Sequence, residues 1–173
     1  FEFLELEQQS LTDALTGLGN RNQLNRTLSG VITQYEQTGG RMAAVMIDLD
    51  DFKPVNDQYG HSIGDEVLIK LAQRMKALLR ETDVLVRLGG DEFAIVLTRV
   101  RAVGDPERLA DRLLNSISEP VLLDNGEKVK LTASIGAAIY PDHARTATDL
   151  LHRADLAMYA VKRRNRCGFE LYD

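Results

Sequence analysis

The sequence predicts an α+β domain, in which helices wrap a central, mostly antiparallel sheet of about five strands and a small β-hairpin is added, as in ferredoxin-like or palm folds. The first observation is the order of periodic segments along the 173 residues, roughly α-β-α-α-β-β-α-β-β-α-β. The second is that two strand pairs are joined by short turns, as antiparallel hairpins are. Strands and helices do not alternate strictly, which disfavours a doubly wound parallel sheet.

The first half of the chain begins with a turn-rich segment and a helix. Residues 13–21 (DALTGLGNR) carry two glycines, and residues 22–37 have apolar side chains at helical spacing until Gly39 and Gly40 end the pattern. Residues 42–50 (MAAVMIDLD) form an unbroken apolar run closed by acids, which predicts a strand buried on both faces.

A polar stretch separates this strand from a long amphipathic helix. The helix is indicated by apolar residues at i, i+3 and i+4 spacing, namely Val67, Leu68, Leu71, Ala72, Met75, Leu78 and Leu79. Residues 83–88 (DVLVRL) and 92–97 (EFAIVL) then predict two strands flanking Gly89 and Gly90, which is a hairpin signal.

The second half supplies the remaining elements. Residues 105–117 are predicted to be a helix with Pro106 in its first turn. Residues 121–140 are interpreted as a strand, an Asn-Gly turn and a second strand. Residues 148–164 have one apolar face and predict a last helix, after which residues 169–172 (FELY) add an edge strand.

The bulk properties are those of one globular domain with a sizeable core. A net charge of −5 argues against a nucleic-acid polymer as partner. The single cysteine, Cys167, excludes an internal disulfide framework, and no apolar run approaches the ~20 residues that span a bilayer. We therefore expect no direct membrane contact. Residues 1–12 are interpreted as a linker helix from an upstream sensory domain, and residues 13–173 as the domain proper.

Four acids stand where the predicted strands end. Asp48 and Asp50 close the strand 42–50, while Asp91 and Glu92 lie in the glycine hairpin. If these strands are neighbours, the carboxylates meet at one edge, where they repel one another unless a cation neutralises them. Hard oxygen ligands select Mg²⁺ or Mn²⁺, which would bridge phosphate oxygens. The alternative is that the acids only mark strand ends and turns.

The polar stretch offers groups that suit a nucleotide. Lys53 can meet phosphate, and Asn56 with Asp65 presents donor and acceptor edges that match guanine. The alternative for Asp65 is a capping box with Ser62. His61 alone is more often a turn residue than a ligand.

Two groups of charges remain open to two interpretations. Lys162 and Arg166 lie in the basic end of the last helix (KRRNR), where they suit either the helix dipole or a triphosphate. Arg80 and Asp83, in RETD before the hairpin, suit either a local ion pair or a binding site.

Taken together, these segments resemble the GGDEF domain of bacterial diguanylate cyclases. The resemblance runs from DALTGLGNR through MIDLDDFKPVNDQYGHSIGDEVL and RLGGDEF to ADLAMYAVKRRNR. It implies a fold related to adenylyl cyclase cores and polymerase palms. It also implies that two GTP molecules, one on each of two facing domains of a homodimer, are joined into cyclic di-GMP with release of pyrophosphate.

The resemblance also implies roles for individual residues. Asp48 and Asp91 match the side-chain metal ligands and the Leu49 carbonyl matches the backbone ligand, while Asp91 is also the expected general base and Glu92 supports the metal. Gly89 and Gly90 match the positions that let the backbone approach the nucleotide. The positions expected to bind GTP are Lys53, Asn56, His61, Asp65, Lys162 and Arg166.

Regulation and context follow from the same resemblance. Arg80 and Asp83 match the RxxD inhibitory site, at which cyclic di-GMP would bind. KRRNRC departs from the usual KxxGRN, with Asn165 in place of glycine and Cys167 in place of asparagine. A cytoplasmic domain of a bacterial signalling protein is expected. The alternative function is a non-catalytic module that binds GTP or cyclic di-GMP and controls an attached domain.

Overall fold

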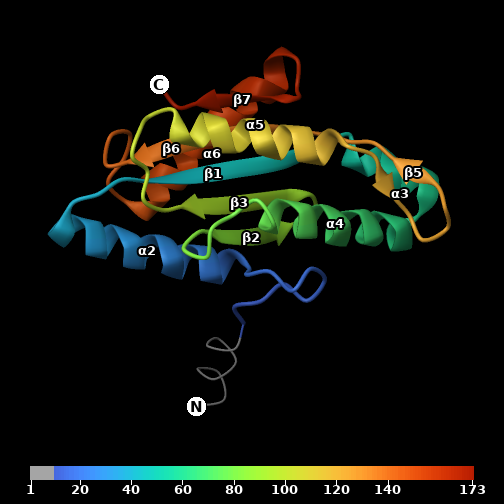
Figure 1. The fold of residues 1–173 in the computed structure, drawn as a ribbon, viewed down its shortest axis with the longest axis horizontal. Coiled ribbons are helices and arrows are strands. Elements are labelled where there is room, and N and C mark those ends of the chain that lie inside the picture. The colour runs from blue at the N-terminus through green and yellow to red at the C-terminus, as the bar shows by residue number, and fades with distance from the viewer. Residues whose placement is uncertain (1–9) are drawn as a thin grey trace.

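The strand β1 (Met42–Asp50) lies at the centre of a five-stranded sheet with the order β2-β3-β1-β6-β7 (Figure 1). Its neighbours are β3 (Glu92–Leu97) and β6 (Thr132–Tyr140), and both pair with it in antiparallel register. This computed structural model describes residues 10–173. The linker helix predicted for residues 1–12 falls on residues 1–9 for the most part, outside the described range.

The two edges of the sheet differ in direction. β2 (Val84–Gly89) pairs antiparallel with β3 and completes the glycine hairpin, whereas β7 (Gly168–Leu171) pairs parallel with β6. The predicted mostly antiparallel sheet and its C-terminal edge strand are therefore confirmed.

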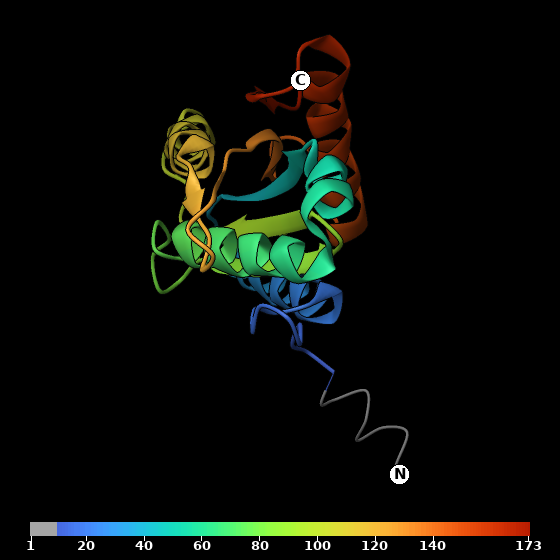
Figure 2. The same cartoon turned by 90° about the vertical axis from the view of Figure 1, so that its right-hand side faces the viewer.

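Helices cover both faces, so that β1 is buried on each side, as its continuous apolar sequence indicates. One face packs against α3 (Phe52–Tyr59), α4 (His61–Lys76) and α5 (Asp105–Ser118). The other packs against α2 (Arg21–Thr38) and α6 (Ala147–Arg164). Figure 2 shows α4 and α5 on one side of the sheet and α6 on the opposite side.

The helix predicted to run through Leu79 ends at Lys76. Leu78 and Leu79 donate their backbone N–H groups to the carbonyls of Met75 and Lys76, three residues back. This tighter turn keeps both leucines against the core, so the apolar pattern continues past the end of the α-helix.

Residues 121–140 contain the predicted small hairpin around the Asn-Gly turn, but the second predicted strand is divided in two, so that this segment forms three strands. β4 (Val121–Leu122) and β5 (Lys128–Val129) make a separate two-stranded hairpin, and only β6 joins the main sheet. The hairpin is closed by hydrogen bonds between Leu123 N–H and the Glu127 carbonyl (2.8 Å) and between Gly126 N–H and the Leu123 carbonyl (3.0 Å). Within residues 10–173, no helix is long and apolar enough to cross a membrane.

Candidate active site and a remote arginine cavity

The predicted acids meet at one edge of the sheet. The register of β1 and β3 places Asp48 opposite Glu92. The backbone N–H of Leu49 donates to the Asp91 carbonyl over 3.2 Å, which ties the end of β1 to the hairpin turn. Strand pairing thus brings together residues that are about 40 positions apart in the chain.

This acidic edge is electrostatically unfavourable for its own charges. Burial, followed by the negative charge of Asp91, raises the pKa of Asp48 to about 6, although Lys162 opposes the shift. The Lys162 Nζ lies 3.2 Å from Asp48 Oδ2 and 3.4 Å from Asp50 Oδ1. One ammonium group is therefore shared between two carboxylates, with Asp91 and Glu92 close by, and a further cation would relieve the remaining negative charge.

The donor chemistry of this edge fits a magnesium or manganese ion. The predicted ligands, the Asp48 and Asp91 carboxylates and the Leu49 carbonyl, are all hard oxygen donors. Across residues 10–173, no cluster of three or more histidine, cysteine or acidic side chains forms a ready-made metal cage. Mg²⁺ is usually bound by one or two protein carboxylates, and substrate phosphates complete its coordination.

The glycine turn is held by two residues that the sequence analysis missed. Gly89 has a φ of 135°, a conformation that only glycine adopts readily. Arg87 donates to the Gly90 carbonyl from Nε (3.0 Å) and from a terminal nitrogen (2.9 Å), and its other terminal nitrogen lies 3.0 Å from Asp13 Oδ1. Asp13 and Arg87 are far apart in sequence, so no local spacing pointed to the pair.

The predicted guanine-binding residues lie on α3 and α4, and Asn56 packs against α4 at Gly64. An added Cβ at Gly64 would lie 1.7 Å from Asn56 Oδ1, so the glycine makes room for this amide. Asp65 follows on α4 and is exposed. The alternative of a capping box is wrong, because α4 begins after Gly60 and no side chain caps it.

Lys53 and His61 are exposed on α3 and α4. Among residues 10–173, neither forms a hydrogen bond or ion pair with the acidic edge. Their predicted contacts with nucleotide stay predictions.

The sequence analysis placed Lys162 and Arg166 together at the end of the last helix. In the structure they do not lie on one continuous helix. α6 ends at Arg164, and Arg166 follows in a left-handed conformation with a φ of 56°. Its guanidinium pairs with Asp51, the residue after β1. Both cations nevertheless reach the C-terminal end of β1, Lys162 from the last helical turn and Arg166 from the loop.

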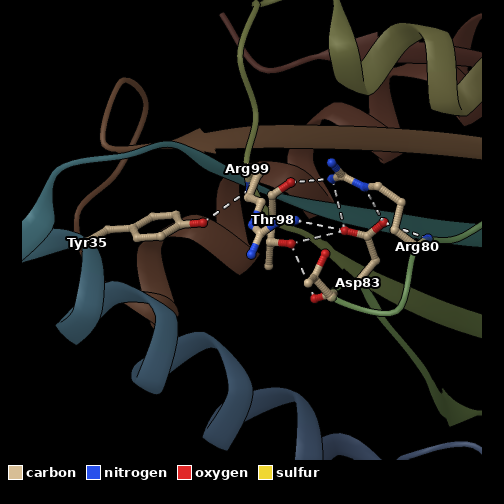
Figure 3. A network of polar contacts seen from close by, with 6 residues as sticks. Tyr35, Arg80, Asp83, Thr98 and Arg99 are labelled. Carbon is tan, nitrogen blue, oxygen red and sulfur yellow. Dashed lines mark hydrogen bonds and ion pairs between the residues drawn. The ribbon is translucent and has the colours of Figure 1, made fainter.

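Arg80 and Asp83 form more than a local ion pair. Asp83 accepts from Arg80 Nε and from a terminal nitrogen, each over 3.1 Å, and from the backbone N–H of Thr98 over 3.0 Å. The Asp83 side chain is only 2% exposed. Figure 3 shows the network continuing to α2, where the backbone N–H of Arg99 donates to the Tyr35 hydroxyl over 3.1 Å.

Beside this network lies a cavity of about 570 Å³ with a strongly cationic lining. The arginines that line it are Arg80, Arg99, Arg101, Arg108 and Arg112. The two lining acids, Asp83 and Asp105, are both paired with arginines. The cavity therefore favours an anionic ligand. It is remote from the acidic edge, because the six residue steps from Glu92 to Thr98 span roughly 20 Å of extended chain.

The fold and the acidic edge define a palm-type α+β domain suited to a nucleotide. The chain belongs to the diguanylate cyclase GGDEF domain family, because the family model described as "Diguanylate cyclase, GGDEF domain" matches residues 10–167. The predicted fold class and family resemblance are thereby confirmed.

Individual relatives agree with this assignment. The diguanylate cyclase TpbB of Pseudomonas aeruginosa is 41% identical over 165 residues, which cover 95% of this chain and 38% of TpbB. The bifunctional diguanylate cyclase/cyclic di-GMP phosphodiesterase MucR of the same organism is 42% identical over 98% of this chain and 24% of MucR. The chain thus spans well under half the length of these relatives.

Solved structures show the same fold. The GGDEF domain of TpbB superposes with a TM-score of 0.91 at 41% identity, covering 94% of each chain. The GGDEF domain of DgcB from Caulobacter crescentus, solved in complex with cyclic di-GMP, has a TM-score of 0.88 at 27% identity, and the match covers 95% of this chain and 96% of that domain's chain.

Proposed function

We propose that this domain condenses two GTP molecules into cyclic di-GMP and releases pyrophosphate. The observation that carries the proposal is the acidic edge, where Asp48, Asp91 and Glu92 gather beside Lys162. Two carboxylates with a backbone carbonyl and an adjacent ammonium suit a metal-bound triphosphate. The relatives named diguanylate cyclases support the same reaction.

Substrate binding is divided among three parts of the domain. Asn56 and Asp65 on α3 and α4 recognise guanine, with His61 beside them, while Gly89 and Gly90 give the nucleotide access to the backbone. Lys162 and Arg166 bind the triphosphate, and Lys53 stabilises charge on the phosphates. This division places base recognition on one helix pair and phosphate binding at the end of β1.

The chemical step is an in-line displacement at the α-phosphorus. The 3′-oxygen of one GTP forms a bond to the α-phosphorus of the other while the bond to the β-phosphate oxygen breaks. Asp91 accepts the 3′-hydroxyl proton, and pyrophosphate leaves. A Mg²⁺ or Mn²⁺ held by Asp48, Asp91 and the Leu49 carbonyl, with Glu92 in support, would neutralise charge that develops on the phosphate oxygens. The protein contributes mainly positioning and electrostatic stabilisation.

Two copies of the chain are needed, because one acidic edge holds one GTP. Two domains face each other as a homodimer, and repetition of the displacement closes the ring. An upstream sensory domain would control how the two copies meet. We place this reaction in the cytoplasm, where GTP is available.

The arginine cavity supports a second proposal, inhibition by product. Cyclic di-GMP carries two phosphates and two guanines. A guanidinium group can donate paired hydrogen bonds to a phosphate and can stack on a guanine ring. Arg80, oriented by Asp83, would bind it far from the acidic edge. Product bound there holds the two active sites apart.

The proposed reaction is tested by incubating the dimeric protein with GTP and Mg²⁺ and searching for cyclic di-GMP by mass spectrometry. Asp91→Ala serves as the inactive control. Product from the unaltered protein and none from Asp91→Ala is the expected result. Absence of product from a preparation shown to be dimeric would favour the non-catalytic binding module instead.

A further inference from the structure

Asp50 is the most completely buried carboxylate at the acidic edge, with only 2% of the residue exposed. Its Oδ1 accepts from the Ser134 hydroxyl (2.8 Å) and from the Lys162 ammonium (3.4 Å). Its Oδ2 accepts from the Thr132 hydroxyl (2.8 Å) and from the Cys167 backbone N–H (2.9 Å). Each oxygen therefore has two donors, which fills the acceptor capacity of the group.

These four donors form two groups: two hold the Asp50 carboxylate in place, and two belong to the segment that the carboxylate holds. Thr132 and Ser134 belong to β6 and hold the carboxylate against the sheet. Lys162 and Cys167 belong to the end of α6 and the loop after it, which is the segment that carries the proposed phosphate-binding cations. A carboxylate fixed by the sheet thus fixes a segment more than 110 residues later in the chain.

The loop after α6 needs this support because its backbone is unfavourable. Arg166 and Cys167 have φ angles of 56° and 48°, so two successive residues with side chains adopt the left-handed conformation. Residues with side chains are strained in this conformation and keep it only where the surroundings hold them. The Cys167 N–H to Asp50 hydrogen bond is a charge-assisted contact made directly by this loop.

We propose that Asp50 is the positioning residue of the triphosphate subsite. It holds Lys162 within reach of the phosphates and fixes the loop from which Arg166 projects, and it does not act as a metal ligand. The inference rests on the proposed function, because it takes GTP as the ligand. Because Asp50 accepts from the backbone N–H of Cys167, this contact does not depend on the side chain at position 167.

The test compares two nucleotides that differ in their phosphates. One is a GTP analogue with a methylene group between the α- and β-phosphates, which cannot react, and the other is GMP. In Asp50→Asn, we expect affinity for the analogue in Mg²⁺ to fall roughly tenfold or more, the equivalent of one charge-assisted contact. GMP affinity should stay within about twofold, because the guanine site on α3 and α4 is untouched.

Two controls separate positioning from other roles. Asp142→Asn makes the same chemical change at the surface pair with Arg41 and should leave both affinities unchanged. The Mg²⁺ concentration needed for analogue binding should rise in Asp48→Asn but not in Asp50→Asn. An equal rise in both variants would make Asp50 a metal ligand and overturn the proposal.

A second variant covers the case in which Asp50→Asn does not fold. Thr132→Val with Ser134→Ala keeps the charge of Asp50 and removes its anchor on β6. It should show the same selective loss for the triphosphate, though a smaller one. Equal losses for the analogue and GMP, or no loss for either, would refute the positioning role. If the unaltered protein binds GMP and analogue equally weakly, the proposed function fails as well, and this result is distinct from a failure confined to the variants.

Discussion

Aspartates in this domain take different roles because their neighbours differ. Asp48 stands among other acids, and burial raises its pKa to about 6. Asp13 is partly buried, which by itself would raise its pKa, but hydrogen bonds from Thr16 and the paired charge of Arg87 outweigh burial and lower the pKa. Asp83 is committed to internal contacts with Arg80 and Thr98. The unrelieved negative charge is therefore concentrated at Asp48, where a cation is expected.

The Asp13–Arg87 pair should stabilise the fold in a pH-dependent way. Because the folded pKa of Asp13 lies below its ordinary value of 3.8, its contribution is fully present above that value and is lost as the pH falls through the folded pKa. Asp13→Asn should lower the free energy of unfolding by about 2 kcal/mol at pH 7, as measured by urea denaturation.

The difference in the free energy of unfolding between Asp13→Asn and the unaltered protein should become steadily smaller below about pH 4. Asp142→Asn, at an exposed pair, should change stability by no more than a few tenths of a kcal/mol. If Asp13→Asn loses the same free energy of unfolding at pH 7 and in acid, the charge of Asp13 does not stabilise the fold.

Arg80 should govern product inhibition without serving the reaction itself. Arg80→Ala removes a fork of donors from the arginine cavity, so cyclic di-GMP affinity should fall about tenfold or more while turnover at low product is retained. Titration calorimetry with cyclic di-GMP and initial rates measure the two quantities. Arg26→Ala, an exposed arginine on α2, is the control. Unchanged affinity for cyclic di-GMP in Arg80→Ala would contradict the proposal that product binds in the arginine cavity.

At the scale of elements, the contact of α3 with α4 sets the proposed guanine site. Gly64→Ala would drive a methyl group into Asn56 Oδ1, so the helices must separate or the amide must turn away. We expect GTP affinity to fall several-fold and the free energy of unfolding to drop by about 1–3 kcal/mol.

Gly30 on α2 provides a matched control, because an added Cβ there meets no atom within 4 Å. Gly30→Ala should stabilise the domain by roughly 0.5–1 kcal/mol, owing to the higher helix propensity of alanine, and leave GTP affinity unchanged. Thermal unfolding and nucleotide titration of both variants decide the matter. If Gly64→Ala changes neither GTP affinity nor stability, the close α3–α4 contact does not determine nucleotide binding.

The elements that sequence predicted best are those with a simple period. The bounds of β1 agree with the structure because its apolar run is continuous and ends in acids, and α6 begins within one residue of its predicted start. The end of α4 and the division of residues 121–140 were predicted wrongly. At both places backbone hydrogen bonds, rather than apolar spacing, decide the structure.

The candidate site was predicted where its residues lie in a recognisable local pattern. Asp91 and Glu92 in the glycine hairpin and Asp48 at a strand end could be paired from the expected sheet. Asp13 with Arg87, and the anchoring of the loop after α6 by Asp50, could not, because these contacts join segments that only the completed fold brings together. The arginine cavity was likewise only partly visible, through Arg80 and Asp83.

At the scale of the whole molecule, the β2–β3 hairpin separates two sites of opposite charge. The acidic edge lies at its turn and the arginine cavity at its open end, roughly 20 Å away at the ordinary rise of a strand. If product binds in the cavity as proposed, it would control the reaction without touching the substrate. On the proposed function, such control would act on how two copies of the domain meet, and the dimer would be the unit of function.

The most direct test of the central claim is the rate of cyclic di-GMP formation, measured with saturating GTP and Mg²⁺ across a range of protein concentrations. If two copies each present one GTP, the rate per protein molecule should rise with concentration until the dimer is fully formed. Two pyrophosphates should then be released for each cyclic di-GMP, and Asp91→Ala should give none. A rate per molecule that does not depend on concentration in a protein that is monomeric throughout, or a saturated dimer without product, would contradict the account.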